Sequence, residues 1–498
     1  MFEGIKGFIR KVGVKLRLIK QLESVTDHKK VSLPEDFYNQ IIKWREMHKG
    51  YLPELHDIKY RTIEKGVDTR TMATLGMPKV VANEMASLIF NERCAISVSD
   101  DDFDTFVEDV LKNNKFNGNF QQYLEFMFAQ GGMVVKPYVK DGEIKLSYVT
   151  ADCFLPISWT NSSITEGVFV SEIKRQGKTY THLEWHTFEG AKYVIKNELY
   201  ESATGVDLGT KVALSVLFDN LEAEVRLDNV KRPLFAYFQP AIANNIDSTV
   251  PLGVSVYANS FDTIKAIDIA FDSFIREFRL GKKRILVPAH MVKTVLDPET
   301  QKFHRYFDPS DETYEAFSDG NMDSDKIHDI SVELRVEEHI AAINAFLNIL
   351  AMQTGFSPGA FTFDGKSMKT ATEVVSENSK TFRTKQSHEN VVEQGITDLI
   401  ECMGVVAELY ELYTPPAEYD VTVTFDDSIA QDRLADINEQ ILLVGSRLQS
   451  RLKAIMKIHG LTEEEALLLI EEINKEELSG QPSLQQLQKE SVLFGPRE

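Results

Sequence analysis

Two short segments of this chain contain residue types whose spacing could support chemistry. The first, residues 359–367, reads GAFTFDGKS and comes close to a phosphate-binding loop, whose backbone N–H groups hold the phosphates of a nucleotide. It has five residues between its two glycines where that loop has four, and the pattern before it is helical rather than a strand. We therefore predict no nucleotide site in this segment.

The second segment, residues 182–186, reads HLEWH. His182, Glu184 and His186 alternate, so on a β-strand their side chains would share one face, as metal ligands could. The zinc-protease motif instead places its two histidines on a helix, with the glutamate directly after the first. Because no third ligand suggests itself, we predict a polar strand face here and no metal or cofactor site.

The patterns of other common enzymes are missing from the sequence. It has no G-x-S-x-G nucleophile elbow and no dinucleotide-binding fingerprint. A glycosidase-like pair of carboxylates cannot be singled out among 76 acidic residues. We predict that the chain is not an enzyme, and a nuclease or an ATPase is the least favoured of the functions considered.

The composition is that of a large, acidic globular protein. Its 498 residues are 43% hydrophobic, and the formal net charge is −21. Such a charge disfavours nonspecific wrapping of DNA, because phosphates must be neutralised by basic groups, but a protein can still surround DNA without gripping it. The cysteines Cys94, Cys153 and Cys402 lie far apart and in no metal-ligand spacing, which indicates buried free thiols in a reducing compartment.

Three long amphipathic segments form the scaffold on which any functional residues of the chain must be positioned. Apolar residues recur at steps of three and four along 254–280, 332–350 and 392–413, and this period predicts helices. An acidic, strand-like insert at 282–330 and a loop with glycine and proline at 355–369 separate them. A long patterned scaffold without catalytic residues favours an assembly component over an enzyme.

In the rest of the chain, the spacing of apolar residues changes from one block to the next. The expected order is a mainly helical block at 35–130 with one continuous helix over 104–130, an antiparallel β region at 133–238, a half-buried strand at 419–425, and helices at 429–458 and 462–477. Helices and antiparallel strands in separate blocks predict an α+β fold with several domains.

Two segments leave alternatives open. Residues 1–21 combine an apolar stripe with basic residues, so they could lie on a membrane surface, although a helix docked on its own or a neighbouring subunit is favoured. The chain has no apolar run of the length that a membrane-spanning helix needs. The polar stretch 376–390 is interpreted as bridging open space or facing a wet cavity, with an ordinary solvated helix face as the alternative.

In this order, the segments resemble the portal proteins of tailed phages, in particular the portal group of phages that infect Gram-positive bacteria. The phrases that carry the resemblance are ASLIFNER at 86–93, NELY at 197–200, KTATEV at 369–374 and FDDSI at 425–429. They resemble, in turn, the end of a helix, a turn between strands, the motif after the tunnel loop, and the residues before the crown. The resemblance extends over residues 30–478.

The resemblance implies a portal-like architecture with a helical and β wing, a two-helix stem, a small β-containing clip, a long wing helix and a helical crown. The implied boundaries are 1–253 for the wing, 254–281 for the first stem helix, 282–330 for the clip, 331–354 for the second stem helix, 355–369 for the tunnel loop, 370–425 for the wing helix and strand, and 426–498 for the crown and tail. The first stem helix would be roughly 40 Å long.

The resemblance also implies a function. The chain would form a homo-oligomeric ring, expected to be a dodecamer, at one capsid vertex of the virion, after assembly in the host cytoplasm. Double-stranded DNA would pass through it during packaging and ejection. The implied partners are the terminase large subunit, a head–tail adaptor, and the major capsid and scaffolding proteins, with no membrane. The alternative is a membrane-surface or other assembly scaffold that uses the basic N-terminal helix.

Two sets of residues are predicted to meet these partners. In the tunnel loop, glycines give the backbone freedom, Phe361 and Phe363 offer bulk, and Lys366 and Lys369 are the nearest positive groups for passing phosphates. The acidic insert would project from the far ends of two antiparallel helices, where it would dock the packaging motor and the adaptor. Its candidate docking residues are Asp297, Glu299, Asp308, Asp311 and Glu312.

Overall fold

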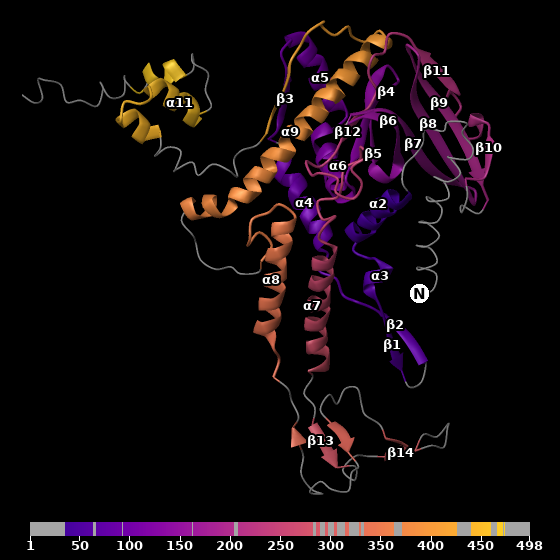
Figure 1. Ribbon diagram of the computed structural model, residues 1–498, viewed down its shortest axis with the longest axis vertical. Coiled ribbons are helices and arrows are strands. Elements are labelled where there is room, and N and C mark those ends of the chain that lie inside the picture. The colour runs from indigo at the N-terminus through magenta and orange to yellow at the C-terminus, as the bar shows by residue number, and fades with distance from the viewer. Residues whose placement is uncertain are drawn as a thin grey trace, which may run out of the picture. The chain divides into compact units, whose positions relative to one another are not determined.

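The computed structural model combines helices and sheets, which confirms the α+β fold class (Figure 1). The residues that it describes are 35–62, 66–91, 93–161, 163–203, 208–281, 285–288, 294–296, 303–305, 314–317, 328–329, 333–362, 371–425, 440–459, 466–471 and 473. The larger of two compact units comprises Met1–Gly365 with Lys380–Asp426, and the smaller comprises Lys366–Ser379 with Asp427–Glu498. The amphipathic segment 1–21 lies outside the described residues.

The first block of the larger unit is mainly helical, as expected. Its elements are α2 Glu35–His48, α3 Pro53–His56, β1 Asp57–Thr62, β2 Gly66–Thr71, α4 Met77–Ile89, β3 Ala95–Val98, α5 Asp101–Asn113 and α6 Phe116–Gln130. The β1–β2 hairpin is not visible in the sequence pattern, because much of its surface is exposed and polar and shows no apolar alternation.

The expectation of one helix over 104–130 is wrong. The chain breaks between α5 and α6 at Lys115, whose φ is 49°. The neighbouring Asn114 fixes this break on strand β5 (Glu143–Thr150): its amide donates to the Ile144 carbonyl at 2.9 Å, and its Oδ1 accepts from the Leu146 N–H at 3.0 Å. Both helices contribute to the same core, so the apolar period alone cannot reveal the break.

The antiparallel β region is confirmed and forms two sheets. The three-stranded sheet has the order β12-β4-β5, and the larger sheet has the order β10-β9-β8-β7-β6, with β11 also paired to β9. The strands of the two sheets are β4 Met133–Lys140, β5 Glu143–Thr150, β6 Phe154–Thr160, β7 Ser163–Arg175, β8 Lys178–Glu189, β9 Lys192–Ser202, β10 Thr210–Val212, β11 Glu224–Leu227 and β12 Ala236–Phe238. Residues 197–200, expected at a turn, lie inside β9, where Leu199 is fully buried.

The two helices on either side of the acidic insert are shorter than predicted. α7 spans Phe261–Leu280, which makes it about 30 Å long rather than 40 Å. Val254 and Tyr257 belong to a buried turn before it, because the Tyr257 hydroxyl donates to the Trp44 carbonyl at 3.0 Å and the backbone around it bonds to other segments. α8 spans Val336–Gln353, so the expected start at 331–332 is also too early.

Short strands form within the insert between α7 and α8, as its pattern suggested. They are β13 Ile285–Pro288, β14 Thr294–Leu296, β15 Phe303–Arg305, β16 Tyr314–Phe317 and β17 His328–Asp329. β13 pairs in parallel with β16 and antiparallel with β17, while β14 pairs antiparallel with β15.

The long helix α9 runs over Ala371–Leu409, and β18 (Val421–Thr424) then pairs antiparallel with β3. One expectation about α9 is wrong, because it ends before Tyr410 and Tyr413. In the polar stretch 376–390, Gln386 and Ser387 are exposed, whereas one side of the helix is buried. Lys385 and His388 are buried in this stretch. Lys385 pairs with Glu389 at 2.8 Å, and the His388 Nδ1 accepts from the Ala241 N–H at 2.9 Å.

The described part of the smaller unit is helical but interrupted. Its residues 440–445 are helical, and α11 (Arg451–His459) follows after a turn in which Arg447 has a φ of 57°. The expectation of one helix over 429–458 is therefore wrong. The predicted start of the next helix at Thr462 lies outside the described residues, whereas residues 466–471 are helical.

Candidate assembly site on helices α7 and α8

The antiparallel helices α7 and α8 lie side by side in the larger unit (Figure 1). Near the end of α7, the Phe274 ring lies 5.3 Å from the His339 ring of α8, centroid to centroid. The Arg335 guanidinium donates to both oxygens of Glu277, at 3.1 and 2.7 Å. This charge-assisted pair is the main reason that the pKa of Glu277 falls to about 2. These contacts fix the register of α8 against α7.

The opposite side of α7 carries two buried carboxylates, Asp268 and Asp272, which are 1% and 7% exposed. Asp268 Oδ1 accepts from the Thr74 hydroxyl at 2.9 Å and from the Leu75 N–H at 2.8 Å, and its Oδ2 lies 3.3 Å from the His56 Nε2. Burial of a carboxylate is tolerated only when such donors replace the lost water. These contacts anchor α7 to the segment before α4.

Asp272 ties α7 to the β1–β2 hairpin. Its two oxygens accept from Arg70 Nη1 at 2.9 Å and Nη2 at 2.6 Å, and its Oδ1 also accepts from the Ala73 N–H at 3.1 Å. The bidentate bond from Arg70 holds the pKa of Asp272 below its usual value in spite of burial. Asp272 and Phe274 lie about 200° apart around the helix, so the hairpin and α8 contact opposite faces of α7.

The turn after α8 is tied to both α8 and α9. Gly355 has a φ of 89°, and a Cβ built there would lie 2.6 Å from a side-chain carbon of Thr384. The Ser357 N–H donates to the Thr381 hydroxyl at 2.9 Å, and the Gly359 N–H donates to Asn348 Oδ1 at 2.7 Å. The described part of the predicted tunnel loop is therefore fixed to the helices on both sides of it.

Of the predicted DNA-channel residues, the structure describes only Phe361. Its ring is half-buried, packs against the main core and lies 5.0 Å from the Phe356 ring, centroid to centroid. Phe363, Lys366 and Lys369 lie outside the described residues. The same holds for all of the predicted docking residues, which are Asp297, Glu299, Asp308, Asp311 and Glu312.

The HLEWH segment lies on β8, and its polar side chains form an internal network. Glu184 Oε1 lies 2.9 Å from the His186 Nε2, and Lys136 also pairs with Glu184. Although burial favours the neutral carboxyl, Lys136 and His186 hold the pKa of Glu184 well below its usual value. Burial lowers the pKa of His182 and of His186, so both favour the neutral ring. Within the described ranges, no group of three or more ligand-type side chains could hold a metal ion.

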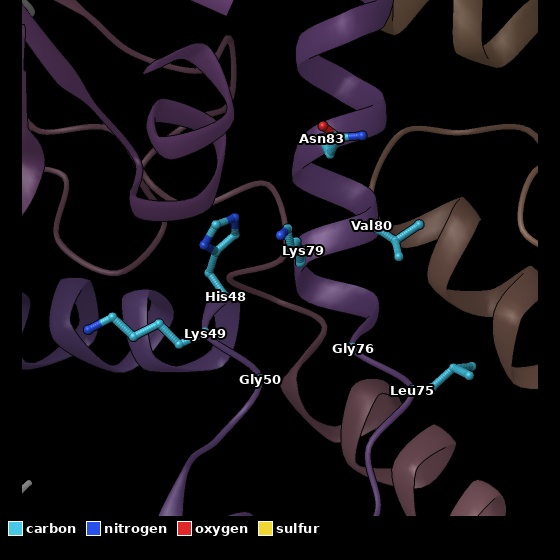
Figure 2. A pocket seen from close by; sticks show the side chains of 8 residues that line it. All are labelled: His48, Lys49, Gly50, Leu75, Gly76, Lys79, Val80 and Asn83. Atoms are coloured by element: carbon cyan, nitrogen blue, oxygen red, sulfur yellow. The ribbon is translucent and has the colours of Figure 1, made fainter. Parts of the chain in front are cut away.

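An open pocket of about 440 Å³ lies between the end of α2 and the start of α4 (Figure 2). It is lined by His48, Lys49, Gly50, Leu75, Gly76, Lys79, Val80 and Asn83. Its basic groups are partly neutralised, because the His48 Nε2 lies 2.8 Å from Glu125 Oε1 and Lys49 pairs with Glu46 at 3.0 Å. None of these eight described residues is a carboxylate, a hydroxyl or a thiol.

Comparison with known proteins identifies the family. A family model described as phage portal protein, SPP1 Gp6-like, matches residues 27–480. The chain belongs to this phage portal family. No curated protein matches the portal sequence significantly. The family match confirms the resemblance to tailed-phage portals, while the Gram-positive host stays a prediction.

Membership of this family gives the portal chain a structural role. The family implies a ring oligomer with capsid and packaging partners. Among the described residues of the portal, no helix is long and apolar enough to cross a membrane.

Sequence reasoning missed the anchor residues of this portal, which are Arg70, Asp268 and Asp272. A signal was present, because Asp268 interrupts the apolar stripe formed by Ile264, Ile267 and Phe271. An acid within an apolar helix face predicts a buried partner. The partners themselves, Thr74 and Leu75, lie more than 190 residues earlier in the chain and could not be found from the period of α7.

Proposed function

We propose that this portal protein forms a homo-oligomeric ring, a dodecamer at the capsid vertex, through which double-stranded DNA is packaged and ejected. The composition of α8 carries this proposal. Leu347 and Leu350 are buried inside the chain, whereas Ile349 and Met352 are 41% and 51% exposed. A helix that is apolar on several sides is normally covered on those sides, which supports packing of α8 against a second chain.

Charge supports the passage of DNA through the ring. A net charge of −21 on every copy makes the ring strongly negative. Like charge repels DNA phosphates, so DNA slides through the channel without adhering, while local lysines or arginines provide brief contacts. The energy for packaging would come from the terminase large subunit, because the portal sequence has no recognisable nucleotide-binding motif.

The portal domains follow from the same proposal. We assign α7 and α8 to the stem, the strands β13–β17 to the clip, and residues 355–369 to the tunnel loop. The elements before α7, together with α9 and β18, form the wing. The second compact unit resumes at Asp427, and this boundary supports a crown that begins near residue 426. Assembly with the scaffolding and major capsid proteins would take place in the host cytoplasm.

The first prediction concerns the ring itself. Purified protein is expected to form closed rings with a central hole and a mass near twelve times that of the 56.5 kDa chain, and not to hydrolyse ATP. Mass photometry, negative-stain microscopy and an ATPase assay measure these properties. A monomer that turns over ATP would exclude the proposal.

The second prediction concerns the clip as the docking surface for the adaptor and the packaging motor. Deletion of residues 297–325 is expected to leave rings intact but to abolish adaptor binding, measured by co-sedimentation. A milder variant changes Asp297, Glu299, Asp308, Asp311 and Glu312 to their amides. It should slow association roughly tenfold and remove its salt dependence, because rim charges act mainly on the association rate. Unchanged binding by the deletion variant would place the docking surface elsewhere.

The third prediction concerns the tunnel loop. Changing Lys366 and Lys369 together to Ala is expected to reduce DNA packaging or retention while rings still form, because the nearest positive charges along the DNA path are lost. Packaging is measured as DNA protected from nuclease inside assembled capsids. The matched control changes both lysines to Arg, which keeps the charge and should package normally. Normal packaging by the Ala variant would show that these lysines do not act on DNA.

A further inference from the structure

A chain of hydrogen bonds runs through His186, between the larger sheet and the three-stranded sheet. At one end, Lys136 of β4 pairs with the Glu184 carboxylate of β8, which lies 2.9 Å from the His186 Nε2. At the other end, the His186 Nδ1 lies 2.8 Å from the Tyr193 hydroxyl of β9. The Leu234 N–H donates to that hydroxyl oxygen at 3.0 Å. We call these five residues the inter-sheet clamp.

The clamp joins the two sheets at both of its ends. Lys136 belongs to β4 of the three-stranded sheet, and Leu234 lies just before β12 of the same sheet, whereas the other members belong to β8 and β9. Helix α9 reaches the same segment, because the Cys402 thiol donates to the Pro233 carbonyl at 3.2 Å. The segment before β12 is therefore held by Tyr193 and by α9.

The hydrogen bonds of the clamp have one consistent direction while His186 is neutral. Although burial favours the neutral carboxyl, Lys136 and His186 hold the pKa of Glu184 low, so this carboxylate only accepts. The His186 Nε2 must then carry the ring proton, and Nδ1 accepts. Burial raises the pKa of Tyr193 well above its usual value, so its O–H remains to donate to Nδ1. Every donor of the clamp then has an acceptor.

The ring of His186 lies in apolar surroundings. The residue is 3% exposed, and the Phe169 and Phe235 rings lie 5.0 and 5.9 Å from it, centroid to centroid. Tyr193 is fully buried. A polar group that loses its partner in such a place is not rehydrated unless the structure around it opens.

Charged and titratable groups from five elements face His186 or its partner Tyr193. They are Lys136 of β4, Glu166 of β7, Glu184 of β8, Tyr193 of β9 and Cys402 of α9. Burial lowers the pKa of His186, Glu184 acts against this shift, and Lys136 adds to it. Glu166 is engaged elsewhere, because its Oε1 accepts from the Phe188 N–H at 2.6 Å. Burial raises the pKa of Cys402 to about 12, so its thiol stays neutral.

From this geometry we infer that protonation of His186 opens the clamp at Tyr193 and frees the segment before β12, so that acid uncouples the two sheets. The proton from solvent adds to Nδ1, and the new N–H points at the Tyr193 oxygen. The Tyr193 O–H loses its acceptor and must turn away, which displaces the Leu234 N–H from the same oxygen. The inference does not depend on the proposed ring.

Hydrogen exchange of the full chain, followed by mass spectrometry, tests this inference in the peptide 230–238. After correction for the intrinsic pH dependence of exchange, its rate at about pH 5 is expected to exceed that at about pH 7.5 by roughly fivefold or more. The peptide 116–130 of α6 should show no such rise. Equal exchange of 230–238 at both pH values, or an equal rise in both peptides, would overturn the inference.

Two variants remove the switch in different ways. H186N keeps a side-chain oxygen that can accept from the Tyr193 O–H but cannot gain a proton, so its peptide 230–238 is expected to exchange at the same rate at both pH values. Y193F removes the hydroxyl, so exchange should be fast at both. A full pH response in either variant would contradict the clamp.

His182 supplies the matched control. It is buried on the same face of β8, and burial lowers its pKa as well, but its Nε2 lies 3.0 Å from Asn197 Oδ1 and not beside Tyr193. H182N should therefore keep the pH response of the unchanged chain. Loss of the response in H182N would assign it to buried histidines in general. If H186N does not fold, the unchanged chain, Y193F and H182N still decide the question.

Discussion

Replacing Asp268 with Ala is expected to lower the free energy of unfolding of the larger unit by about 3 kcal/mol. The carboxylate is 1% exposed and accepts hydrogen bonds from the Thr74 hydroxyl and the Leu75 N–H. Its removal leaves these donors buried without an acceptor and opens a small cavity at the base of α7. Chemical denaturation followed by circular dichroism measures the effect.

The matched control is Asp262 in the first turn of the same helix, which is exposed. D262A should cost no more than about 0.5 kcal/mol, through the helix dipole alone. Equal losses from D268A and D262A would contradict the anchoring role of Asp268.

The neighbouring anchor adds a pH dependence. Arg70 lowers the pKa of Asp272 in the folded state, so the stability from this carboxylate is present above the pKa of the unfolded state, near 3.9, and is lost as the pH falls towards the folded value. D272A should therefore flatten the stability profile of the larger unit below about pH 4.

Replacing Gly253 with Val is expected to destabilise the larger unit by about 3 kcal/mol or more, and to shift the protein into the insoluble fraction. A Cβ at Gly253 would lie 2.4 Å from the Gly131 carbonyl oxygen and 2.8 Å from the Gln239 Cβ. The obstacle at Gly131 is backbone at the end of α6, which cannot rotate away. The chain before α7 would be pushed off α6, and α7 with it.

Gly118 of α6 is the matched control for Gly253. Nothing lies within 4 Å of a Cβ built there, and no unusual φ requires glycine. G118A is expected to be neutral or to stabilise by up to about 1 kcal/mol, because alanine favours the helix. Soluble yield and thermal unfolding of the two variants measure the difference. A well-folded G253V would show that the contact with Gly131 is not a constraint.

The long helices and the β region show how much of the fold can be predicted from the sequence. The spacing of apolar residues is sufficient to predict α7, α8 and α9 as helices, because a helix that buries one side must repeat its apolar residues every three to four positions. The β region follows in the same way from alternation and from turns such as Asp141 and Gly142, whose φ angles are 55° and 78°. The order of these elements, together with phrases such as those at 86–93 and 369–374, suggested the portal family, which the family match then showed.

Helix ends and breaks depended on contacts that the period does not contain. Tyr257 continues the apolar stripe of α7, yet its hydroxyl bonds to Trp44, more than 200 residues earlier, and the helix starts only at Phe261. Asn114 ends α5 because its amide is used by β5. In both cases contacts with a distant segment hold the local backbone in a conformation other than the helix.

The sequence by itself determined the fold class, the long helices, the acidic charge and the family. Only the tertiary structure decided which side chains anchor these helices and which of their side chains are exposed. Arg70 and Asp272 are far apart in the chain and meet only after folding, because a buried carboxylate needs donors from whichever segment packs against it. The same reason applies to the exposed side chains of α7 and α8: a side chain is exposed or covered according to its neighbours in space, which sequence spacing does not specify.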